Sequence, residues 1–295
     1  MIAVIIVDYH SGNLTRRALA SLVTLGRDGL RFIVVDNGDS LDAARMEADF
    51  PHLAVLKPGR NLGFAGGCNL GMVRALEYGA EYCLLLNPDT RAETDFIRPL
   101  LAAMEAEPRI GIAAPTILQD DQGRRVTDGG GLVNWWSGTA RGVTDRRLRA
   151  EGPYLEVPFA TGAAMLIRSE AIKQVGPMDE GYFLYYEDSD YCQAFIQKGW
   201  KIGYLPQAEL LHATSSVSGR GSESYLYYFA RNRIRFVRRW ARWYHRPVFL
   251  LFNGMVRLPA MVALYGLIRR RPVAAVAIIR GFLDGIRGNS GPMPS

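Results

Sequence analysis

Short apolar runs alternate with stretches of helical character through the first third of the chain. The apolar runs that we expect to form strands cover residues 2–7, 31–35, 53–56 and 82–86. Helices are expected between them, at residues 14–25, from residue 41, and at residues 65–78. This order predicts βαβ units, and hence an α/β fold with a mixed, mainly parallel sheet that has helices on both faces.

The next part of the chain is less regular. Residues 115–158 carry glycines, the pair Trp135-Trp136 and mixed charge without a helical period, which indicates an irregular ribbon or loop region. Beyond them the pattern predicts a strand at residues 161–168 and a helix at residues 187–199. Tyr191, Ala194 and Phe195 should face inward from that helix. Two short strands are expected at residues 201–205 and 209–212.

Polar residues follow the predicted strands of the first third, and the ends of parallel strands meet at one edge of a sheet. Asp8 follows the first strand and Asp36 follows the second. A carboxylate at Asp36 can accept a hydrogen bond from a uracil or thymine base, or from a ribose hydroxyl. The sequence Asp36-Asn37-Gly38 is also typical of a turn, so both interpretations stay open here.

A second polar group follows the fourth strand, where Asn87-Pro88-Asp89 combines an amide oxygen with a carboxylate. A few protein oxygens together with substrate phosphates are the ligands expected for Mg²⁺ or Mn²⁺. His212 ends another apolar run, from which it can reach such a metal or a diphosphate. The alternatives are a turn at Pro88 and a structural histidine. The residues beyond His212 include candidate phosphate donors: Ser215, Ser216 and Ser218.

Residues 61–71 are rich in glycine around the expected start of a helix, with glycines at positions 63, 66, 67 and 71. Bare backbone amides at a helix start can bind an anion. Close backbone packing is the alternative, since the spacing matches neither the dinucleotide fingerprint nor a P-loop.

Three carboxylates, Glu187, Asp188 and Asp190, follow an aromatic run at the expected N-terminus of a helix. Acidic residues there can cap the helix and interact favourably with its dipole. They can equally hold a general base that accepts the proton of a sugar hydroxyl. Both roles stay open at this point.

Composition and charge change this picture mainly at the C-terminus. With 48% hydrophobic and 22% charged residues, the 295-residue chain is typical of a folded protein, and it is neither disordered nor a multi-span membrane protein. Its net charge is −6 for residues 1–212 but +12 for residues 213–295. Three scattered cysteines indicate neither a disulfide framework nor a zinc site. The apolar start fits a buried strand better than a signal peptide, so secretion is not expected.

The basic C-terminal region interleaves arginines with apolar residues. Residues 229–243 predict a basic helix with an aromatic side, which suits an anionic membrane surface. Residues 247–268 are about long enough to span a membrane, but polar residues and a proline interrupt them, which favours interfacial or re-entrant helices. A further amphipathic segment covers residues 273–286. The alternatives are nucleic-acid binding and a packed helical subdomain. The arginines of the first helix are Arg231, Arg233, Arg235, Arg238, Arg239 and Arg242.

Taken in this order, the motifs resemble the family 2 glycosyltransferases of GT-A fold, especially the bacterial rhamnosyltransferase-like branch. The resemblance covers about residues 1–240. It rests on Val7-Asp8-Tyr9, Val-Val-Asp36-Asn, Asn61-Leu-Gly-Phe-Ala-Gly-Gly-Cys-Asn69, Leu-Asn87-Pro-Asp89, residues 162–168, residues 178–190, His212 and Arg231-Asn232.

The resemblance implies a Rossmann-like GT-A catalytic domain at residues 1–220, with a nucleotide-sugar half at about 1–115 and an acceptor half at about 116–220. A basic, membrane-associating helical region follows at residues 221–295. Asp188 would be the catalytic base, and Asp89 and His212 would bind the metal. Donor contacts are implied for Asp8, Asp36, Asn61, Gly63, Gly66, Gly67, Asn69 and Asn87. Acceptor contacts or a role in shaping the site are implied for Trp135, Trp136, Gly162, Tyr186, Glu187 and Asp190.

The implied activity is metal-dependent transfer of a sugar, with inversion, from a nucleotide-diphosphate sugar to an acceptor hydroxyl. The cation would be Mg²⁺ or Mn²⁺, and the donor is open between dTDP-rhamnose and UDP-sugars. The implied acceptor is a glycan or glycolipid of cell-surface polysaccharide synthesis. The enzyme is expected to be cytoplasmic and peripherally associated with the inner face of the plasma membrane. No nucleic-acid partner is expected. The alternatives are a sugar nucleotidyltransferase and an inactive, membrane-bound nucleotide-sugar binder. Asn87 at the first acidic position and Ala194, where relatives commonly carry arginine, depart from the pattern.

Overall fold

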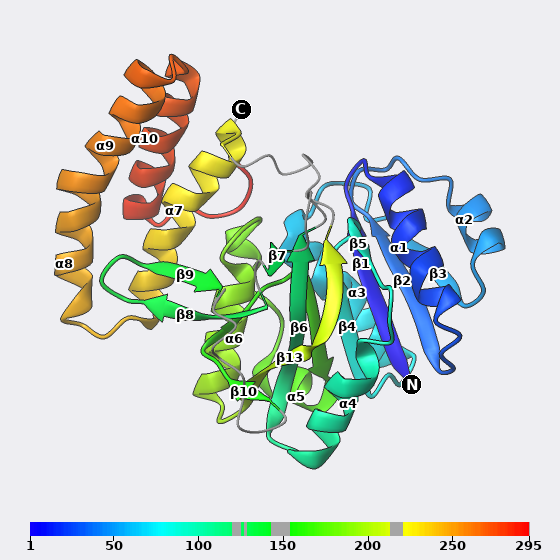
Figure 1. The fold of residues 1–295 in the computed structure, drawn as a ribbon. Coiled ribbons are helices and arrows are strands. Elements are labelled where there is room, and N and C mark those ends of the chain that lie inside the picture. The colour runs from blue at the N-terminus through cyan, green and yellow to red at the C-terminus, as the bar shows by residue number, and fades with distance from the viewer. Residues whose placement is uncertain (120–124, 127–128, 143–153, 213–220, 295) are drawn as a thin grey trace.

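The computed structural model describes residues 1–119, 125–126, 129–142, 154–212 and 221–294. A large sheet with helices on both faces forms one part of the molecule, and a group of C-terminal helices stands beside it (Figure 1). This arrangement confirms the predicted α/β fold with a mixed, mainly parallel sheet.

The order of the strands shows how the sheet positions the site. Along the sheet the order is β10 (Leu155–Glu156), β13 (Lys201–His212), β6 (Ile110–Gln119), β12 (Ala164–Arg168), β4 (Tyr82–Leu86), β1 (Ile2–Asp8), β2 (Leu30–Asp36) and β3 (Leu53–Leu56). β4, β1, β2 and β3 are mutually parallel, and β13 is parallel to β6. β12, in the middle, runs antiparallel to both of its neighbours, and β10 at one end runs antiparallel to β13. The carboxyl ends of β1, β2 and β4 therefore meet at one edge.

The helices cover the sheet because each strand buries side chains on both faces. One face packs on α1 (Gly12–Thr24), α2 (Ala43–Asp49) and α4 (Ile97–Ala106), with Val4 and Ile6 of β1 in that cluster. The other packs on α3 (Gly63–Glu77), α5 (Ser169–Val175) and α6 (Glu187–Gln197), with Ile5 and Val7. The alternation of β1 between two cores explains its unbroken apolar sequence.

Two sequence expectations need correction in this domain. The short strands expected at residues 201–205 and 209–212 are one strand, β13, whose register with β6 shifts between Leu205 and Glu209. A bulge therefore absorbs the residues that were expected to separate two strands. The ribbon expected within residues 115–158 contains regular pieces: β6 extends to Gln119, and β8 (Gly130–Asn134) and β9 (Thr139–Gly142) form a small sheet with β11 (Phe159–Ala160). Two further short strands are β5 (Thr90–Arg91) and β7 (Arg125–Val126).

The C-terminal region begins with α7 (Glu223–Trp240). A long apolar helix follows, made of α8 (His245–Phe252), α9 (Leu258–Val262) and two π-helical segments, Asn253–Arg257 and Ala263–Ile268. The chain then returns as α10 (Pro272–Arg287). α10 packs tightly on α7 because Gly281 has no side chain: a Cβ there would lie 2.2 Å from the carbonyl oxygen of Tyr227.

The structure corrects the role predicted for the basic helix. Arg231 and Arg233 of α7 are buried, at 1% and 6% exposure, and Arg235 and Arg239 pair with acidic residues of the catalytic domain. Arginines that pack inside the protein cannot face a membrane. The side of α7 that carries Arg231 and Arg233 is thus packed, as in the alternative interpretation, whereas Arg238 and Arg242 are exposed and membrane association of the region stays a prediction.

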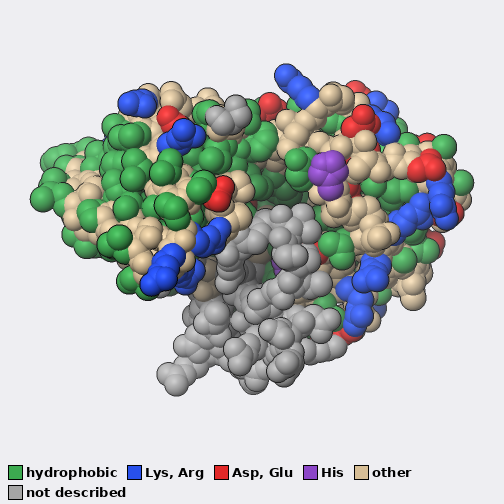
Figure 2. Space-filling view, turned by 90° about the horizontal axis from the view of Figure 1, so that it is seen from above, with side chains coloured by type: hydrophobic (Ala, Val, Ile, Leu, Met, Phe, Trp, Pro, Cys, Tyr) green, Lys and Arg blue, Asp and Glu red, His purple; other side chains and the backbone are tan. Residues whose placement is uncertain are grey.

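The helix at His245–Ile268 has a different environment. Its 24 residues are long and apolar enough to cross a membrane, by length and composition, and 17% of its most apolar stretch is buried. Hydrophobic side chains gather over this end of the molecule in the space-filling view (Figure 2). Whether the segment lies at the interface or re-enters the membrane stays a prediction.

Candidate active site

The end of β4 and the end of β13 bring together the three predicted metal-site residues. Asp89 Oδ1 lies 3.1 Å from His212 Nε2, and the Asn87 side-chain nitrogen lies 3.4 Å from the same imidazole nitrogen. β5 fixes this geometry because Thr90, next to Asp89, pairs with His212 across the β5–β13 ladder. Residues 125 positions apart in sequence therefore share one corner of the sheet edge.

This corner suits a divalent cation with few protein ligands. The Asp89 and His212 side chains are 14% and 24% exposed, so both can be reached from solvent. Within the described residues, no group of three or more His, Cys, Asp or Glu side chains could hold a metal ion. A carboxylate and an imidazole would thus have to be completed by waters and by the phosphates of a substrate. The pair fits a substrate-bridged cation and not a fully protein-bound one.

Asp188 lies in the first turn of α6, where the helix dipole favours a negative charge. Its Oδ2 accepts a hydrogen bond from the backbone N–H of Gly162 at 3.0 Å, and its Oδ1 accepts from the backbone N–H of Ser189 at 2.6 Å. The side chain is half-buried, whereas Glu187 and Asp190 are buried. Of the three clustered carboxylates, Asp188 is therefore the one open to a substrate.

The buried neighbours have structural environments. Glu187 is 5% exposed, and its Oε2 finds no hydrogen-bond partner in the described parts of the chain. Burial, together with the adjacent Asp188, raises the pKa of the Glu187 carboxyl well above its ordinary value. Glu187 is thus a buried carboxyl that favours its protonated form.

Asp190 links α6 to the C-terminal region. It accepts hydrogen bonds from Tyr182, Arg239 and Trp240 at 2.9, 2.9 and 2.6 Å. Burial raises the pKa of Asp190, against the opposing influence of Trp240 and Arg239. Asp190 therefore ties the start of α6 to α7, and the site-shaping role implied for it stays a prediction.

A short loop joins Asp188 to the corner formed by Asn87, Asp89 and His212. Gly162 donates to Asp188, and the carbonyl of the next residue, Ala163, accepts the backbone N–H of Asn87 at 3.0 Å. A Cβ at Gly162 would lie 3.4 Å from the Asp188 Cβ, so a side chain there would crowd the base. Gly162 therefore lies against Asp188, and its role in shaping the site stays a prediction.

The aromatic loop before α6 is held in an unusual conformation. Phe183, Tyr185 and Tyr186 all have positive φ, of 63°, 67° and 74°, which costs energy for residues other than glycine. The Asn232 side chain donates to the carbonyls of Tyr182, Leu184 and Tyr185 at 2.8–3.0 Å. These bonds offset the strain and fix the segment that leads into Asp188.

Arg231 adds to this clamp, with hydrogen bonds to the carbonyls of Gly181 and Tyr182 at 3.1 and 2.8 Å. Arg231-Asn232 is one of the motifs that carry the family resemblance, but no role was predicted for the pair. The sequence does carry a signal for this role: Arg231 and Asn232 lie on the packed side of an amphipathic helix. Buried polar side chains need hydrogen-bond partners, so a neighbouring segment had to supply them.

The strand ends of β1 and β2 give a more mixed result. Asp36 is 1% exposed; it accepts the backbone N–H groups of Ser40 and Leu41 and lies 3.8 Å from Lys57 Nζ. Its contact with a donor base stays a prediction. Asn37, which the sequence analysis treated only as a turn residue, joins this loop to the glycine-rich segment by a 2.8 Å bond to the Gly63 carbonyl.

Asp8 was implied to contact the donor, but the structure gives it a different place. It is fully buried, and its carboxylate accepts hydrogen bonds from Ser11 and Thr15 at the start of α1. Asp8 therefore holds α1 to the end of β1, and its buried carboxylate is committed to these bonds.

The glycine-rich segment also packs inside the protein. A Cβ at Gly63, Gly66 or Gly67 would lie 2.4–2.8 Å from Phe183, Leu62 or Val7 respectively. Asn61 accepts the N–H of Gly63, while Asn69 bonds to Met178 and Glu180 across to the aromatic loop. Close packing of α3, the alternative considered for this segment, is what the structure shows for these glycines and for Asn69.

The tryptophan pair and Tyr186 lie on the side of the C-terminal helices. Trp135 stacks on Phe236 at 5.3 Å, and Trp136, half exposed, packs against His245. Tyr186 donates its hydroxyl hydrogen to the Gly138 carbonyl at 2.8 Å. These three residues therefore line the junction with the helices instead of surrounding Asp188. The candidate phosphate donors Ser215, Ser216 and Ser218 lie outside the described residues.

The fold and this edge of polar side chains define a nucleotide-sugar-dependent glycosyltransferase of the GT-A type. A model of the family described as "Glycosyl transferase family 2" matches residues 3–176. The chain belongs to this family, whose members invert the configuration of the transferred sugar.

Two curated relatives cover nearly the whole chain. The N-acetylglucosaminyl-diphospho-decaprenol L-rhamnosyltransferase of Mycobacterium tuberculosis (strain CDC 1551 / Oshkosh) is 26% identical, over 95% of this chain and 98% of its own. The dTDP-rhamnosyl transferase RfbF of Shigella flexneri is also 26% identical, over 97% of this chain and 96% of its own. Both relatives extend beyond the family match, so the similarity includes the C-terminal helices.

Solved structures show the same fold at low identity. GalNAc-T7 with UDP, GalNAc and Mn²⁺ superposes with a TM-score of 0.70 at 16% identity, covering 97% of this chain and 56% of that longer chain. The mannosyltransferase PcManGT of Pyrobaculum calidifontis, in complex with GDP-Man and Mn²⁺, gives a TM-score of 0.56 at 14% identity, covering 97% and 86%. These likenesses establish the GT-A fold.

Proposed function

We propose that this glycosyltransferase transfers rhamnose from a nucleoside-diphosphate donor to a hydroxyl of a lipid-linked glycan at the inner face of the plasma membrane. The observation that carries the proposal is the placement of Asp188. It is the accessible carboxylate of its cluster, and Gly162 and Ala163 join it to the corner formed by Asn87, Asp89 and His212. A base and a diphosphate-binding corner at one sheet edge are what a single displacement requires.

The base step follows from the hydrogen bonds of Asp188. The acceptor oxygen attacks the anomeric carbon, its proton passes to the Asp188 carboxylate, and the bond to the diphosphate oxygen breaks. The N–H groups of Gly162 and Ser189, together with the Ser189 hydroxyl, fix the direction of the carboxylate, and each carboxylate oxygen can accept more than one hydrogen bond. Attack opposite the leaving group gives the inverted product.

Asp89 and His212 are proposed to bind the cation that accompanies the donor. A divalent cation bound there would neutralise the charge that develops on the departing nucleoside diphosphate. An imidazole among the ligands favours Mn²⁺ over Mg²⁺, since Mg²⁺ binds chiefly oxygen and keeps several waters. The Mn²⁺ in two solved structures of this fold supports this choice.

The names of the curated relatives support the choice of donor and acceptor. One names an L-rhamnosyltransferase and a diphospho-decaprenol acceptor, and another names dTDP-rhamnose. The exposed apolar helix His245–Ile268 supports a membrane location for such an acceptor. The family match gives the rival sugar nucleotidyltransferase no support.

A thermal-shift screen of nucleotide-sugars with Mn²⁺ or Mg²⁺ tests this function, because a specific donor stabilises the folded state by mass action. We expect dTDP-rhamnose with Mn²⁺ to raise the Tm more than UDP-sugars do. Product analysis with an N-acetylglucosaminyl-diphosphate lipid should then show release of dTDP. Release of pyrophosphate, or stabilisation by UDP-sugars in preference to dTDP-rhamnose, would refute the proposal.

A further inference from the structure

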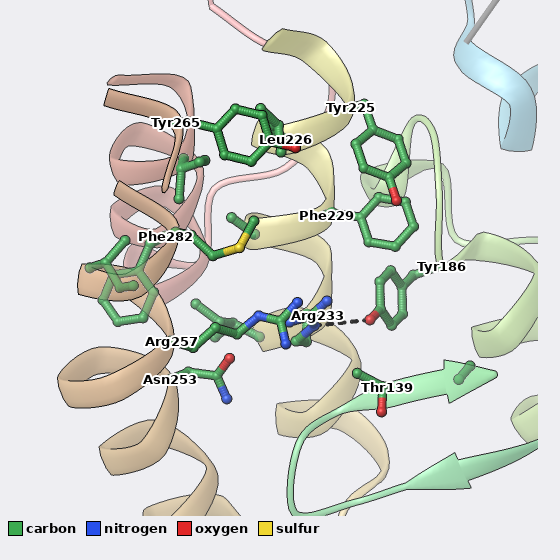
Figure 3. Close-up of a pocket in the computed structure, with 16 residues that line it drawn as sticks. Thr139, Tyr186, Tyr225, Leu226, Phe229, Arg233, Asn253, Arg257, Tyr265 and Phe282 are labelled. Atoms are coloured by element: carbon green, nitrogen blue, oxygen red, sulfur yellow. Dashed lines mark hydrogen bonds between the residues drawn. The ribbon is translucent and has the colours of Figure 1, made fainter. Parts of the chain in front are cut away.

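A cavity of about 330 Å³ lies between the catalytic domain and the C-terminal helices. Its walls come from β9, the end of the aromatic loop, α7, the long apolar helix and α10 (Figure 3). This volume falls at the lower end of the range of about 300–1,000 Å³ that is typical of ligand sites. The catalytic residues Asp89, Asp188 and His212 are not part of its wall.

The charged side chains that line the cavity, Arg233 and Arg257, are both cationic. Arg233 on α7 and Asn253 on the apolar helix are both more than nine-tenths buried, and Arg257 joins them one helical turn further on. Figure 3 shows the side chains of Arg233 and Arg257 pointing toward each other across the cavity. Two guanidinium groups that converge in a poorly solvated space favour an anion between them. Their planar, multiple donors match the oxygens of a diphosphate.

The remaining wall is apolar and leads to the exposed hydrophobic surface. Leu226 and Phe229 of α7, Met261 of α9, and Ile278 and Phe282 of α10 contribute to it. The helix that carries Arg257 and Met261 belongs to the apolar segment that is long enough to cross a membrane. A ligand that is anionic at one point and apolar along its length would thus match both the cavity and the surface beside it.

The cavity is linked to the catalytic edge through Tyr186. The Tyr186 hydroxyl accepts a 3.1 Å hydrogen bond from Arg233 Nε, drawn as a dashed line in Figure 3, and the residue lies two positions before Asp188. A group bound by Arg233 is therefore next to the segment that fixes the base.

We propose that this cavity binds the diphosphate and the first isoprenoid units of a polyprenyl-diphosphate acceptor, with Arg233 and Arg257 on the diphosphate. The inference rests on the proposed function, which supplies the lipid-linked acceptor. It adds the place where the lipid carrier is held. The sugar of the acceptor then extends past Tyr186 toward Asp188, while the prenyl chain follows the apolar helix into the bilayer.

Calorimetric titration of the full-length protein with farnesyl diphosphate tests the site. We expect wild type to bind this probe at least tenfold more tightly than farnesol, which lacks the anion, and than inorganic diphosphate, which lacks the prenyl chain. Arg257→Gln should weaken binding of farnesyl diphosphate about tenfold or more and leave farnesol binding unchanged. Arg280→Gln, on the exposed side of α10, is the matched control and should bind as wild type does.

Met261→Trp provides a second variant that fills the cavity and keeps both arginines. It should weaken farnesyl diphosphate and farnesol alike, and the unfolding temperature checks that either variant folds. Equal binding of farnesyl diphosphate by wild type, Arg257→Gln and Met261→Trp would overturn the site, and so would equal affinity for inorganic diphosphate.

Kinetics separate this inference from the proposed function. Arg257→Gln should raise the KM for the polyprenyl-diphosphate acceptor about tenfold or more, without a matching rise in the KM for the nucleotide-sugar. If the wild type transfers rhamnose and the variant shows no change in acceptor KM, the site is wrong and the function stands. If the wild type transfers no rhamnose although farnesyl diphosphate binding depends on Arg257, the function is wrong and the site stands.

Discussion

The sheet domain and the C-terminal helices use hydrophobic side chains in opposite ways. In the sheet domain the strands are buried, and polar side chains gather at one edge to form the site. In the C-terminal region, apolar side chains lie outside: 14 of the 21 exposed large hydrophobics among the described residues fall between Trp243 and Ile286. Exposed apolar surface of this kind is typical of an interaction site, so we expect the second region to contact a membrane or another apolar partner.

α7 lies where the two regions meet, and like the elements of the sheet domain it buries one side inside the protein. Its buried side carries Arg231, Asn232 and Arg233, each with partners in the loop or hydrogen-bond network of the catalytic domain. The arginines of this C-terminal region therefore have two different environments. On α7 the buried arginines bind the aromatic loop that precedes Asp188, and beyond α7 the arginines accompany an apolar surface.

The largest expected effect lies at the sheet edge. Asp188→Asn should lower turnover about 10²-fold or more, because it removes the general base. It should leave the Tm shift produced by the donor nearly intact, since Asp188 is not assigned to the donor. Glu170→Gln, on the exposed side of α5, is the control. Near-normal turnover in Asp188→Asn would remove that residue from the role.

The metal corner should give the next largest effect. Loss of a residue that supports a metal ligand typically lowers metal affinity roughly 10- to 100-fold. Asp89→Asn removes a proposed ligand itself, so we expect Mn²⁺-dependent donor binding to weaken by at least that factor. The Tm shift measured with dTDP-rhamnose at increasing Mn²⁺ concentration reports it. Asp39→Asn, an exposed carboxylate paired with Lys57, should behave as wild type. An unchanged Mn²⁺ requirement in Asp89→Asn would place the cation elsewhere.

The junction between the two regions is tested at Asn232. Asn232→Ala leaves buried carbonyls of the aromatic loop without a donor, at about 1–3 kcal/mol for each group that stays unsatisfied. Chemical denaturation should show a loss of roughly 2 kcal/mol or more, whereas ordinary surface substitutions such as Asn289→Ala stay within about 0.5 kcal/mol. Equal stability of the two variants would mean that the Asn232 hydrogen bonds do not stabilise the strained loop.

The outer surface of the C-terminal region is better tested by substitution than by deletion, because removal of α10 would uncover α7. Leu251→Gln with Met255→Gln changes two side chains that are 60% and 74% exposed. We expect at least tenfold weaker binding to anionic vesicles, since full burial of each such side chain is worth roughly 1.5–3 kcal/mol and a tenfold change needs only about 1.4 kcal/mol from the pair. Enzymatic turnover with a soluble acceptor is the control. Vesicle binding equal to that of wild type would contradict a membrane role for this surface.

The smallest effect is expected at Glu187. Because the folded chain raises the pKa of this carboxyl, the wild type loses stability as the pH rises through the unfolded value of about 4.3. Glu187→Gln has no proton to lose, so it should have a higher Tm than wild type at pH 7. The difference should disappear as the pH falls to about 4. A Tm difference that is constant across this pH range would rule out a titrating Glu187.

The sequence predicted the sheet, and the polar residues at its strand ends, well because those features depend on local patterns. Apolar strands that end in Asp36, Asn87 or His212 signal the edge of a parallel sheet, and the structure brings Asn87, Asp89 and His212 together there. The resemblance also pointed to Asp188. The structure adds that Asp188 is half-buried, whereas its neighbours Glu187 and Asp190 are buried.

What the sequence could not give depends on contacts between distant segments. Asp8 and Asn69 have the residue types of ligand-binding groups, and only the structure shows that both are buried and bonded to α1 and to the segment before the aromatic loop. In the same way, Asn232 lies 47–50 positions from the carbonyls that it binds. Polar side chains that stabilise a fold and those that bind a substrate look alike until their partners are known.

The configuration of the product tests the central claim most directly. Purified protein would be incubated with dTDP-β-L-rhamnose, Mn²⁺ and an N-acetylglucosaminyl-diphosphate lipid, and the anomeric configuration of the product determined by NMR. We predict an α-linked rhamnosyl product that Asp188→Asn fails to form at a comparable rate. A β-linked product, or a product that forms equally fast without the Asp188 carboxylate, would contradict a single displacement driven from this edge of the sheet.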